Sequence, residues 1–407
     1  MVSELSSKTS NDATGPLSGI RVIDFTRVIA GPLCGRLLAD QGADVIKVEP
    51  LSPDMTRAAP PLVGGFSAYF THFNAGKRGV SVDLGDPEAA AAVMTMVEGA
   101  DVVIENFRPG VLARFGLGAQ DVLRRNPGLV YCSISGYGQQ GEWANRRCFA
   151  PVVHGESGLL ASSARLSATE VRPEPHSHAD IQAAYLASMA ISSALFDGER
   201  TGKGAHLDIS LAEASVYSNE FTGPELSGQT GAAFYGGSAC LVLTLGDGSM
   251  ATTQGNPANT FKDWLGAMGR PELKTDDRFR RHADRLNNRA EVDEIILQWA
   301  LTIPDFESLH EIVDPYGLAI GLVRNLTDLA ETSWAKQRGL VAESIVGLRH
   351  ARVPYRSSQH EIGSSGPPPA RGEHNESVFV ELADKTPEQV AAMTDRGALE
   401  TASDGAS

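Results

Sequence analysis

The stretch around Asp180 holds the residues best suited to chemistry in this sequence. It reads RPEPHSHADIQAAYLAS from Arg172 to Ser188, with His176 and His178 just ahead of Asp180 and a long apolar run behind it. Three interpretations are open. The histidines and the aspartate could bind a metal ion, the aspartate could cap a helix, or its carboxylate could react.

A metal site would use imidazole and carboxylate ligands, which are common partners of zinc. Residues at positions i, i+2 and i+4 face one side of an extended strand, so such a strand would bring the three side chains together. A proline-flanked loop that leads into a helix does not hold this register. We therefore interpret His176 and His178 as loop residues and expect no metal.

A helix is expected from Ile181 onward. Ser177 and Asp180 have the spacing of a capping box, and an acidic first turn suits the positive end of the helix dipole. The cap does not exclude reactivity, since helix N-termini also bind anions. The nearly apolar run from Ala183 to Phe196 predicts a buried helix that is too short to cross a bilayer.

The elements that would position these residues follow an α/β pattern. Short apolar segments alternate with helical ones, which is typical of a largely parallel sheet whose ligand binds beyond the carboxyl ends of the strands. The expected strands are Ile20–Thr26, Asp44–Glu49, Gly79–Leu84, Ala100–Phe107 and Gly128–Ser135, and a helix is expected over Asp86–Glu98.

The second half of the chain predicts a smaller α+β domain. A Gly-rich linker is expected from Gly223, a hairpin through Gly246–Gly248, and two or three amphipathic helices between Thr260 and about Glu311. Ser364–His374 is expected to be a second linker, and Pro387–Arg396 a final helix.

Composition narrows the classes of function. The 407 residues are 42% hydrophobic and 21% charged, as expected for a globular protein of two or three domains. A formal net charge of −15 argues against general binding of nucleic acid or anionic membranes, so a polyanionic ligand needs a local cluster of Lys and Arg. Four scattered cysteines and no signal peptide predict a reducing cytoplasm.

A dinucleotide-binding dehydrogenase is not expected. Its G-x-G-x-x-G loop should follow the first strand, but the sequence there is TRVIAGPLCG, with only Gly31 and Gly35 and with Pro32 between them.

An ordered set of motifs points to a family instead. The motifs cover Gly19–Pro50, Asp54–Arg57, Phe73–Leu84, Ala100–Leu117, Asn126–Gly141 and Ala179–Ala214, and GRPEL, DDRF, NNRAEV, QRGLV and GEHNESV continue them. Together they closely resemble the family III CoA-transferases, also called the CaiB/BaiF family. The resemblance extends from about Gly19 to Ala398.

The resemblance implies a Rossmann-like large domain, a smaller α+β domain on long linkers, and a homodimer whose two chains interlock as rings. The expected divisions are a disordered tail over residues 1–18, the large CoA-binding domain over 19–222, a linker and the small domain over 223–335, a C-terminal segment returning to the large domain over 336–398, and a tail over 399–407.

The resemblance also implies that Asp180 is a nucleophile. Its carboxylate would attack an acyl-CoA thioester to give an acyl-aspartyl anhydride, and the released thiolate would then form an enzyme–CoA thioester that passes CoA to an acceptor acid. Acyl-CoA and an organic acid would be the substrates. No permanently bound cofactor and no metal would be required.

Further site residues are carried over by position from the resemblance. Those expected at the CoA site are Arg27, Val28, Ala30, Asn106, Phe107, Arg114 and Arg147, and those expected at the acyl pocket are Phe149, Ala150 and His154. Lys77 and Arg78 are expected to add positive charge near the CoA phosphates. Pro50 and Gly85 depart from the family pattern, because some relatives have a basic residue at these positions.

Two other activities stay open. α-Methylacyl-CoA racemases resemble the transferases but exchange a proton through a histidine–aspartate pair. Their histidine position holds Phe149 here, and His154 is expected to be a helix residue, so transfer is favoured and racemisation is the alternative. A binding protein for CoA esters would lack the aspartate. Formate and oxalate are not expected as substrates, since the Gly-rich loop of formyl-CoA transferases is not evident in Thr253–Asn259.

Overall fold

The computed structural model describes residues 15–167, 169–228, 240–343, 347–363 and 366–401, which form two compact units. Unit 1 contains the described residues up to 159, residues 174–219 and those from 333 onward. Unit 2 contains residues 160–173 and 220–332. Residues 1–14 of the predicted N-terminal tail lie outside the described residues.

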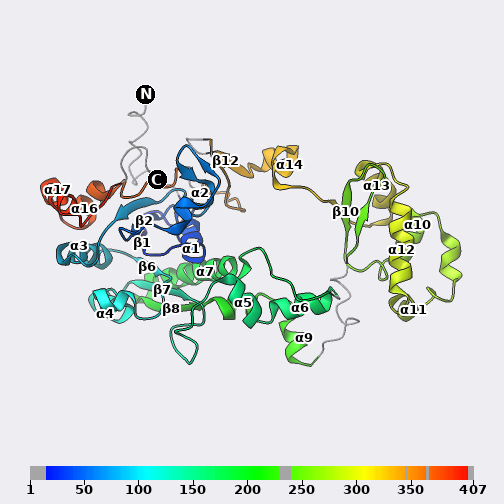
Figure 1. The fold of residues 1–407 in the computed structure, drawn as a ribbon, viewed down its shortest axis with the longest axis horizontal. Helices are drawn as coiled ribbons and strands as arrows, with labels where there is room; N and C mark the ends of the chain where they lie inside the picture. Colours follow the sequence, from blue (N-terminus) through cyan, green and yellow to red (C-terminus); the bar gives the residue numbers. More distant parts are fainter. Residues whose placement is uncertain (1–14, 168, 229–239, 344–346, 364–365, 402–407) are drawn as a thin grey trace. The chain divides into compact units, whose positions relative to one another are not determined.

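A six-stranded parallel sheet forms the centre of unit 1, in the order β5-β2-β1-β6-β7-β8 (Figure 1). The strands are β1 (Arg21–Asp24), β2 (Asp44–Glu49), β5 (Arg78–Ser81), β6 (Val102–Glu105), β7 (Val130–Ser135) and β8 (Ala205–Ser210). All five predicted strands are confirmed, with ends that differ by a few residues. Strands β2 and β5 follow β1 on one side of it, and β6 then pairs with β1 on the opposite side. Open α/β sheets bind ligands where the strand order reverses in this way.

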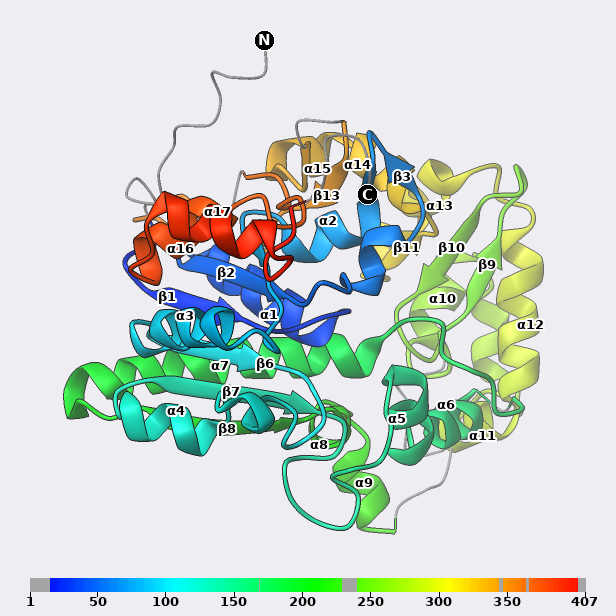
Figure 2. The ribbon, with the colours of Figure 1, turned by 60° about the vertical axis from the view of Figure 1, so that its left-hand side comes forward.

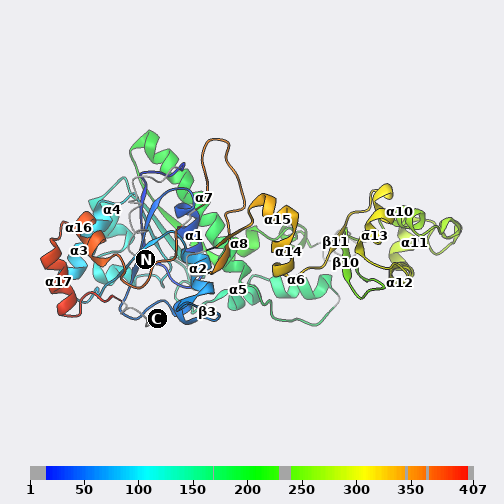
Figure 3. The same cartoon turned by 90° about the horizontal axis from the view of Figure 1, so that it is seen from above.

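Helices cover both faces of this sheet, because neighbouring residues of each strand point to opposite faces. Val22 and Val45 belong to the core beneath α1 (Ala30–Ala39) and α7 (His178–Thr201). Ile23 and Ile46 belong to the core beneath α3 (Pro87–Glu98), α16 (Asn375–Leu382) and α17 (Pro387–Asp395). Figures 1 and 3 show the two groups of helices on opposite sides of the strands.

The remaining elements of unit 1 are short. They are η2 (Met55–Ala58), β3 (Leu62–Val63), β4 (Phe66–Ser67), α2 (Ala68–Asn74), η3 (Leu112–Phe115), α4 (Ala119–Arg125), α5 (Ala150–Glu156), α8 (Leu211–Tyr217), α15 (Ser333–Arg338), β12 (Val341–Glu343) and β13 (Arg349–Ala351).

Both ends of the described chain pair with unit 1 and are not tails there. The Leu17 N–H donates to the carbonyl of Gln41 at 2.9 Å. Leu399 is 2% exposed and forms a β-bridge with Val82. The predicted tails therefore extend too far into the chain, because Leu17, Leu399 and Glu400 form backbone hydrogen bonds within the fold.

The predicted hairpin and α+β character of unit 2 are confirmed (Figure 2). Its antiparallel sheet has the order β11 (Ile320–Leu322), β10 (Met250–Thr253) and β9 (Val242–Thr244), and Trp264 is fully buried in its core. The helices are α6 (Leu159–Leu166), α9 (Thr222–Leu226), α10 (Phe261–Ala267), η5 (Pro271–Thr275), α11 (His282–Asn287), α12 (Arg289–Ala300), α13 (Phe306–Val313), η6 (Asp314–Tyr316) and α14 (Leu326–Glu331).

Residues 160–173 group with unit 2, although the predicted boundary places them in the large domain. The Ser162 hydroxyl on α6 donates to Glu225 Oε1 on α9 at 2.6 Å, and Arg165 forms an ion pair with the same carboxylate. The predicted Gly-rich linker begins inside α9, and its residues 229–239 lie outside the described part of the chain.

The apolar run from Ala183 to Phe196 lies in α7, but the helix is only half-buried. Its buried face consists mainly of alanines and Ile191, whereas Tyr185, Met189 and Phe196 are 52, 61 and 68% exposed. The prediction of a buried helix is therefore wrong for one face. No helix among the described residues is long and apolar enough to cross a membrane.

Candidate active site

Asp180 lies in the first turn of α7. The helix begins at His178 with Ser177 as its N-cap, three residues earlier than predicted. The Ser177 side chain forms no capping hydrogen bond, so the predicted capping box is wrong. Its backbone has φ −82° and ψ 56°, which is not the extended conformation that directs an N-cap side chain toward the first turn.

The amino ends of two helices meet at the Asp180 carboxylate. Ala30 is the first residue of α1, and its backbone forms a hydrogen bond with Asp180, while α1 packs along α7. Burial raises the pKa of Asp180 from 3.8 to about 6, and the hydrogen bond from Ala30 opposes this rise. The carboxylate is therefore ionised at neutral pH but weakly solvated, as suits a nucleophile.

Two further protic groups lie near Asp180, and neither was predicted as part of the site. Burial and then the charge of Asp180 raise the pKa of Tyr69. The same two causes raise the pKa of Cys148 to about 11. Both side chains stay protonated at neutral pH, so each can donate a hydrogen bond.

A buried ion pair between Lys47 and Asp54 fixes the loop between β1 and α1. Val28 has φ 71°, a left-handed conformation that is strained for a β-branched residue. Its N–H donates to Asp54 Oδ2 at 3.1 Å. Lys47 Nζ lies 3.3 Å from the same oxygen and donates to the Thr26 carbonyl at 2.7 Å. This pair fixes the backbone that leads to Ala30.

Lys77 and Arg78 do not supply free charge for CoA phosphates, so that expectation is wrong. Lys77 is buried, and its Nζ donates to Asp24 Oδ2 at 2.8 Å. Arg78 forms ion pairs with Asp44 and, at 2.7 Å, with Glu381. Both positive charges are therefore balanced within the fold.

Arg27, Asn106 and Phe107 are brought together across the reversal point of the sheet. Arg27 follows β1 and Asn106 follows β6. Asn106 Oδ1 accepts from the Arg27 N–H at 2.9 Å, and Asn106 Nδ2 donates to the Arg27 carbonyl at 2.7 Å. The exposed Arg27 guanidinium lies 5.8 Å from the centre of the Phe107 ring. Asn106 therefore holds the loop backbone, and the Arg27 guanidinium forms no ion pair with any residue that the structure describes.

Arg114 and Arg147 are exposed cations on separate segments. Arg114 lies on η3, and Arg147 lies in the loop before α5. Neither forms an ion pair with any described residue, so both charges are available to an anionic ligand.

The three residues expected at the acyl pocket differ in accessibility. Phe149 is 60% exposed, whereas Ala150 and His154 on α5 are buried. His154 Nε2 accepts from the Ala179 N–H at 3.2 Å, so this ring braces the start of α7. The prediction that His154 is a helix residue is confirmed.

Comparison with known proteins identifies the family. A family model described as CoA-transferase family III matches residues 17–375. The chain belongs to CoA-transferase family III. The resemblance seen in the motifs is thereby confirmed, and with it the expectation of a transferase.

Relatives of this family III CoA-transferase match it over nearly their whole length. Succinate–glutarate CoA-transferase from Agrobacterium fabrum is 33% identical, covering 90% of this chain and 96% of the relative. Succinyl-CoA–D-citramalate CoA-transferase from Chloroflexus aurantiacus is 30% identical, covering 93% and 96%. The crystal structure of a CaiB/BaiF family protein from Brucella suis is 31% identical, with a TM-score of 0.79, and covers 91% of this chain and 100% of that one.

One buried acid beside the transferase's loops was not found from the sequence. Glu105 at the end of β6 is 6% exposed, and its Oε2 accepts from the Phe107 N–H at 2.8 Å. Burial raises the pKa of Glu105 to about 7, although a hydrogen bond from Ser133 opposes the rise. Glu105 thereby shapes the turn that carries Asn106.

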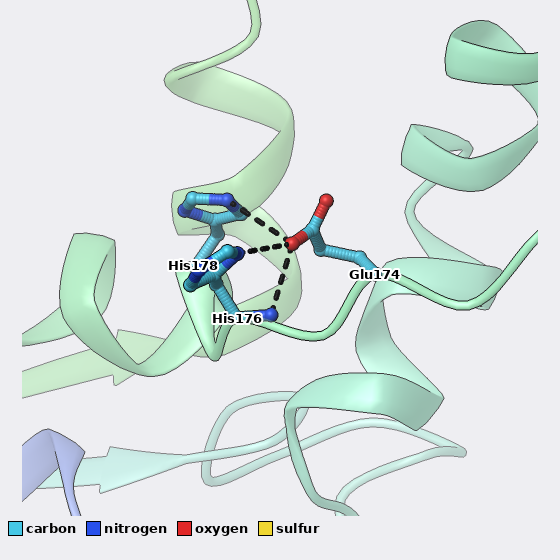
Figure 4. Close-up of side chains that lie close together, drawn as sticks. All are labelled: Glu174, His176 and His178. Atoms are coloured by element: carbon cyan, nitrogen blue, oxygen red, sulfur yellow. Dashed lines mark hydrogen bonds and ion pairs between the residues drawn. The ribbon is translucent and has the colours of Figure 1, made fainter. Parts of the chain in front are cut away.

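His176, just before the transferase's α7, and His178, its first residue, do not join Asp180. His176 Nδ1 lies 2.8 Å from Glu174 Oε1, and His178 Nε2 lies 3.6 Å from the same oxygen (Figure 4). The grouping with Asp180 that the sequence spacing suggested is therefore absent from the described structure. Glu174 takes the place of the aspartate.

Proposed function

We propose that the protein moves CoA from an acyl-CoA donor to a carboxylic acid acceptor, with Asp180 as the nucleophile. The observation that supports this most strongly is the position of Asp180, a half-buried carboxylate where the amino ends of α1 and α7 meet. This end of the fold also carries the reversal of strand order between β1 and β6.

The proposed reaction proceeds through two kinds of covalent intermediate. The Asp180 carboxylate attacks the thioester carbonyl, the C–S bond breaks, and an acyl-aspartyl anhydride and CoA thiolate form. The thiolate attacks the aspartyl carbonyl and releases the donor carboxylate, leaving Asp180 as a CoA thioester. The acceptor carboxylate displaces the thiolate to form a second anhydride. The thiolate then attacks the acceptor's acyl carbon and frees Asp180, with no net proton change.

Backbone and side-chain donors would stabilise the negative oxygen formed at each attack. The backbone of Ala30 at the start of α1 forms a hydrogen bond with Asp180, and helix N-termini favour negative charge. Protonated Tyr69 and Cys148 would supplement them. Fixed donors of this kind need little rearrangement during the reaction.

CoA would bind across the loops after β1 and β6. The free Arg27 guanidinium beside Phe107 would take the adenine or a phosphate, and the backbone of Val28 and Ala30 would line the site. Arg114 and Arg147 would contribute further phosphate contacts, since an exposed guanidinium without a partner in the described structure can bind phosphate through two N–H groups.

Succinyl-CoA is the first donor to test, because two curated relatives carry succinyl or succinate in their names. The exposed Phe149 would face the acyl group, while Ala150 and His154 would support it from behind. We propose a screen of succinyl-CoA and other acyl-CoA donors against organic acids, read by mass spectrometry of the new CoA ester. Transfer to none of the acids would count against the proposed activity.

Trapping experiments test the nucleophile. Protein mixed with a competent acyl-CoA and treated with hydroxylamine or borohydride should be modified at Asp180, and the Asp180→Ala variant should not be. Turnover without modification of Asp180 would refute this assignment. Uptake of deuterium at the α-carbon of a 2-methylacyl-CoA would instead support a racemase. If His154 were its proton-transfer base, that side chain would have to leave its buried position.

An interlocked homodimer is the proposed assembly. The outer face of α7 exposes Tyr185, Met189 and Phe196 along one long helix, and an exposed apolar strip of this kind is typical of an interface. Light scattering during size-exclusion chromatography should give twice the chain mass of 43.1 kDa. A monomer that is fully active would contradict the proposal.

A further inference from the structure

Three polar side chains converge on one point at the start of α7. Glu174 Oε1 lies 2.8 Å from His176 Nδ1 and 3.6 Å from His178 Nε2. All three potential ligand atoms lie within 4.8 Å of one another. Figure 4 shows both imidazole rings directed toward the same carboxylate oxygen. The backbone N–H of His176 also donates to this oxygen at 2.9 Å, so the turn itself holds the carboxylate in place.

We propose that Glu174, His176 and His178 form a zinc-binding site. Ligand atoms in a tetrahedral site with bonds of about 2.0–2.1 Å are separated by about 3.3 Å. The present separations from the Glu174 oxygen, 2.8 and 3.6 Å, lie on either side of this value. Small side-chain rotations would therefore bring the three ligands around one ion.

The exposure of the cluster leaves room for a metal and for water. The His176 and His178 side chains are 74 and 48% exposed, and the Glu174 side chain is 28% exposed. Three protein ligands with an accessible fourth position are a common zinc arrangement. Two imidazoles also favour zinc over magnesium, which prefers six oxygen ligands.

The neighbouring rings restrict how His178 can turn. Its ring centre lies 5.6 Å from that of His176 and 6.3 Å from that of His154. His154 is fully buried and is held by the Ala179 N–H. One ligand of the proposed site is therefore packed beside a fixed ring, which lowers the entropy lost when a metal binds.

A bound ion would connect two parts of the chain. Glu174 is the residue at which the chain returns from unit 2 to unit 1, and His178 is the first residue of α7. Zinc bound by Glu174 and His178 would fix the segment at Glu174 to the first turn of α7. Asp180, two residues after His178, is not one of the proposed ligands.

The test is a calorimetric zinc titration of the untagged full-length chain carrying Cys240→Ser. This substitution removes an exposed thiol that could bind zinc elsewhere. We expect one equivalent of zinc per chain and no binding of magnesium. Glu174→Gln and His176→Gln should each weaken zinc binding by roughly tenfold or more, since even residues outside the coordination sphere change affinity by about 10–100-fold. His360→Gln, at another exposed histidine, should bind as the parent does.

Thermal unfolding provides a second readout of the same proposal. Zinc should raise the melting temperature of the parent by linkage, and it should raise that of Glu174→Gln less. His178→Gln gives an independent test if one of the other variants folds poorly. Absence of zinc binding by the parent would overturn the proposal. The proposal would also be overturned if the folded Glu174, His176 and His178 variants still bound one equivalent of zinc with the affinity of the parent.

Discussion

Replacing Asp180 by asparagine distinguishes a reactive carboxylate from a helix cap, because the two roles change stability in opposite directions. Burial raises the pKa of Asp180 from 3.8 to about 6. At about 1.36 kcal/mol for each pKa unit, this difference corresponds to about 3 kcal/mol of unfavourable free energy for the ionised form. Because the side chain is half-buried, solvent screening lowers the figure to roughly 2 kcal/mol.

A smaller contribution has the opposite sign. A negative charge in the first turn of a helix typically stabilises it by roughly 0.3–1 kcal/mol, and asparagine loses this interaction. The net expectation for Asp180→Asn at pH 8 is a gain of about 1 kcal/mol in the free energy of unfolding. The raised pKa lowers wild-type stability as pH rises through about 6, so the gain should disappear below pH 3.8, where Asp180 is neutral.

Calorimetry and a CoA-transfer assay on the same preparations measure both effects. At pH 8, with a chelator present, Asp180→Asn should melt about 1–2 °C higher than wild type and should lose transfer activity. Asp197→Asn changes an exposed residue of the same helix and should alter neither quantity much. A lower melting temperature with activity retained would refute the reasoning and assign Asp180 to the helix dipole alone.

Three other substitutions follow from the same structure. Glu105→Gln should remove part of the pH dependence of the free energy of unfolding, because a pKa of about 7 in place of 4.5 makes the wild type lose up to about 3 kcal/mol of stability as pH rises from 4.5 to 8. Denaturant titrations at pH 5 and 8 would measure this loss, and an equal change in wild type and variant would contradict the prediction. Asp54→Ala should lower the free energy of unfolding by about 3–5 kcal/mol, because it leaves Lys47 buried without its partner, whereas the double variant Asp54→Ala/Lys47→Met should lose much less. Thermal unfolding of the two single variants and the double variant would measure this, and strictly additive losses would contradict the prediction. Arg147→Ala should raise the KM for acyl-CoA several-fold with little change in kcat, while Arg124→Ala, which removes a cation paired with its own helix, should leave both unchanged in steady-state assays.

The central sheet and helix α7 could be predicted from sequence because their signals are local. Apolar β-rich runs between helical segments define the strands, and the long run after Asp180 defines α7. The half-exposed face of α7 could not be predicted, since Tyr185 and Met189 have the same apolar character as the buried side chains between them. Which face of a helix is covered depends on what packs against it.

The surroundings of Asp180 depended on contacts between distant residues and were mostly missed. Tyr69 precedes Asp180 by more than a hundred positions, and nothing in its own segment marks it. Lys77 has the sequence character of a surface charge, yet it is fully buried against Asp24. Ser177 has the residue type of a cap but not its backbone angles. Burial and dihedral angles of this kind are set by the whole fold.

The outer strand β5 is completed by residues that are synthesised almost 300 positions after it. The Gly79 N–H donates to His374 Nδ1 at 3.1 Å, and the Ser81 N–H donates to Asn375 Oδ1 at 3.0 Å. These partners are separated by 295 and 294 positions. At about 5–20 residues per second, β5 waits roughly 15–60 s for them during synthesis. An unpaired outer strand is prone to aggregate, so the nascent chain has to be protected at this edge until its C-terminal segment emerges.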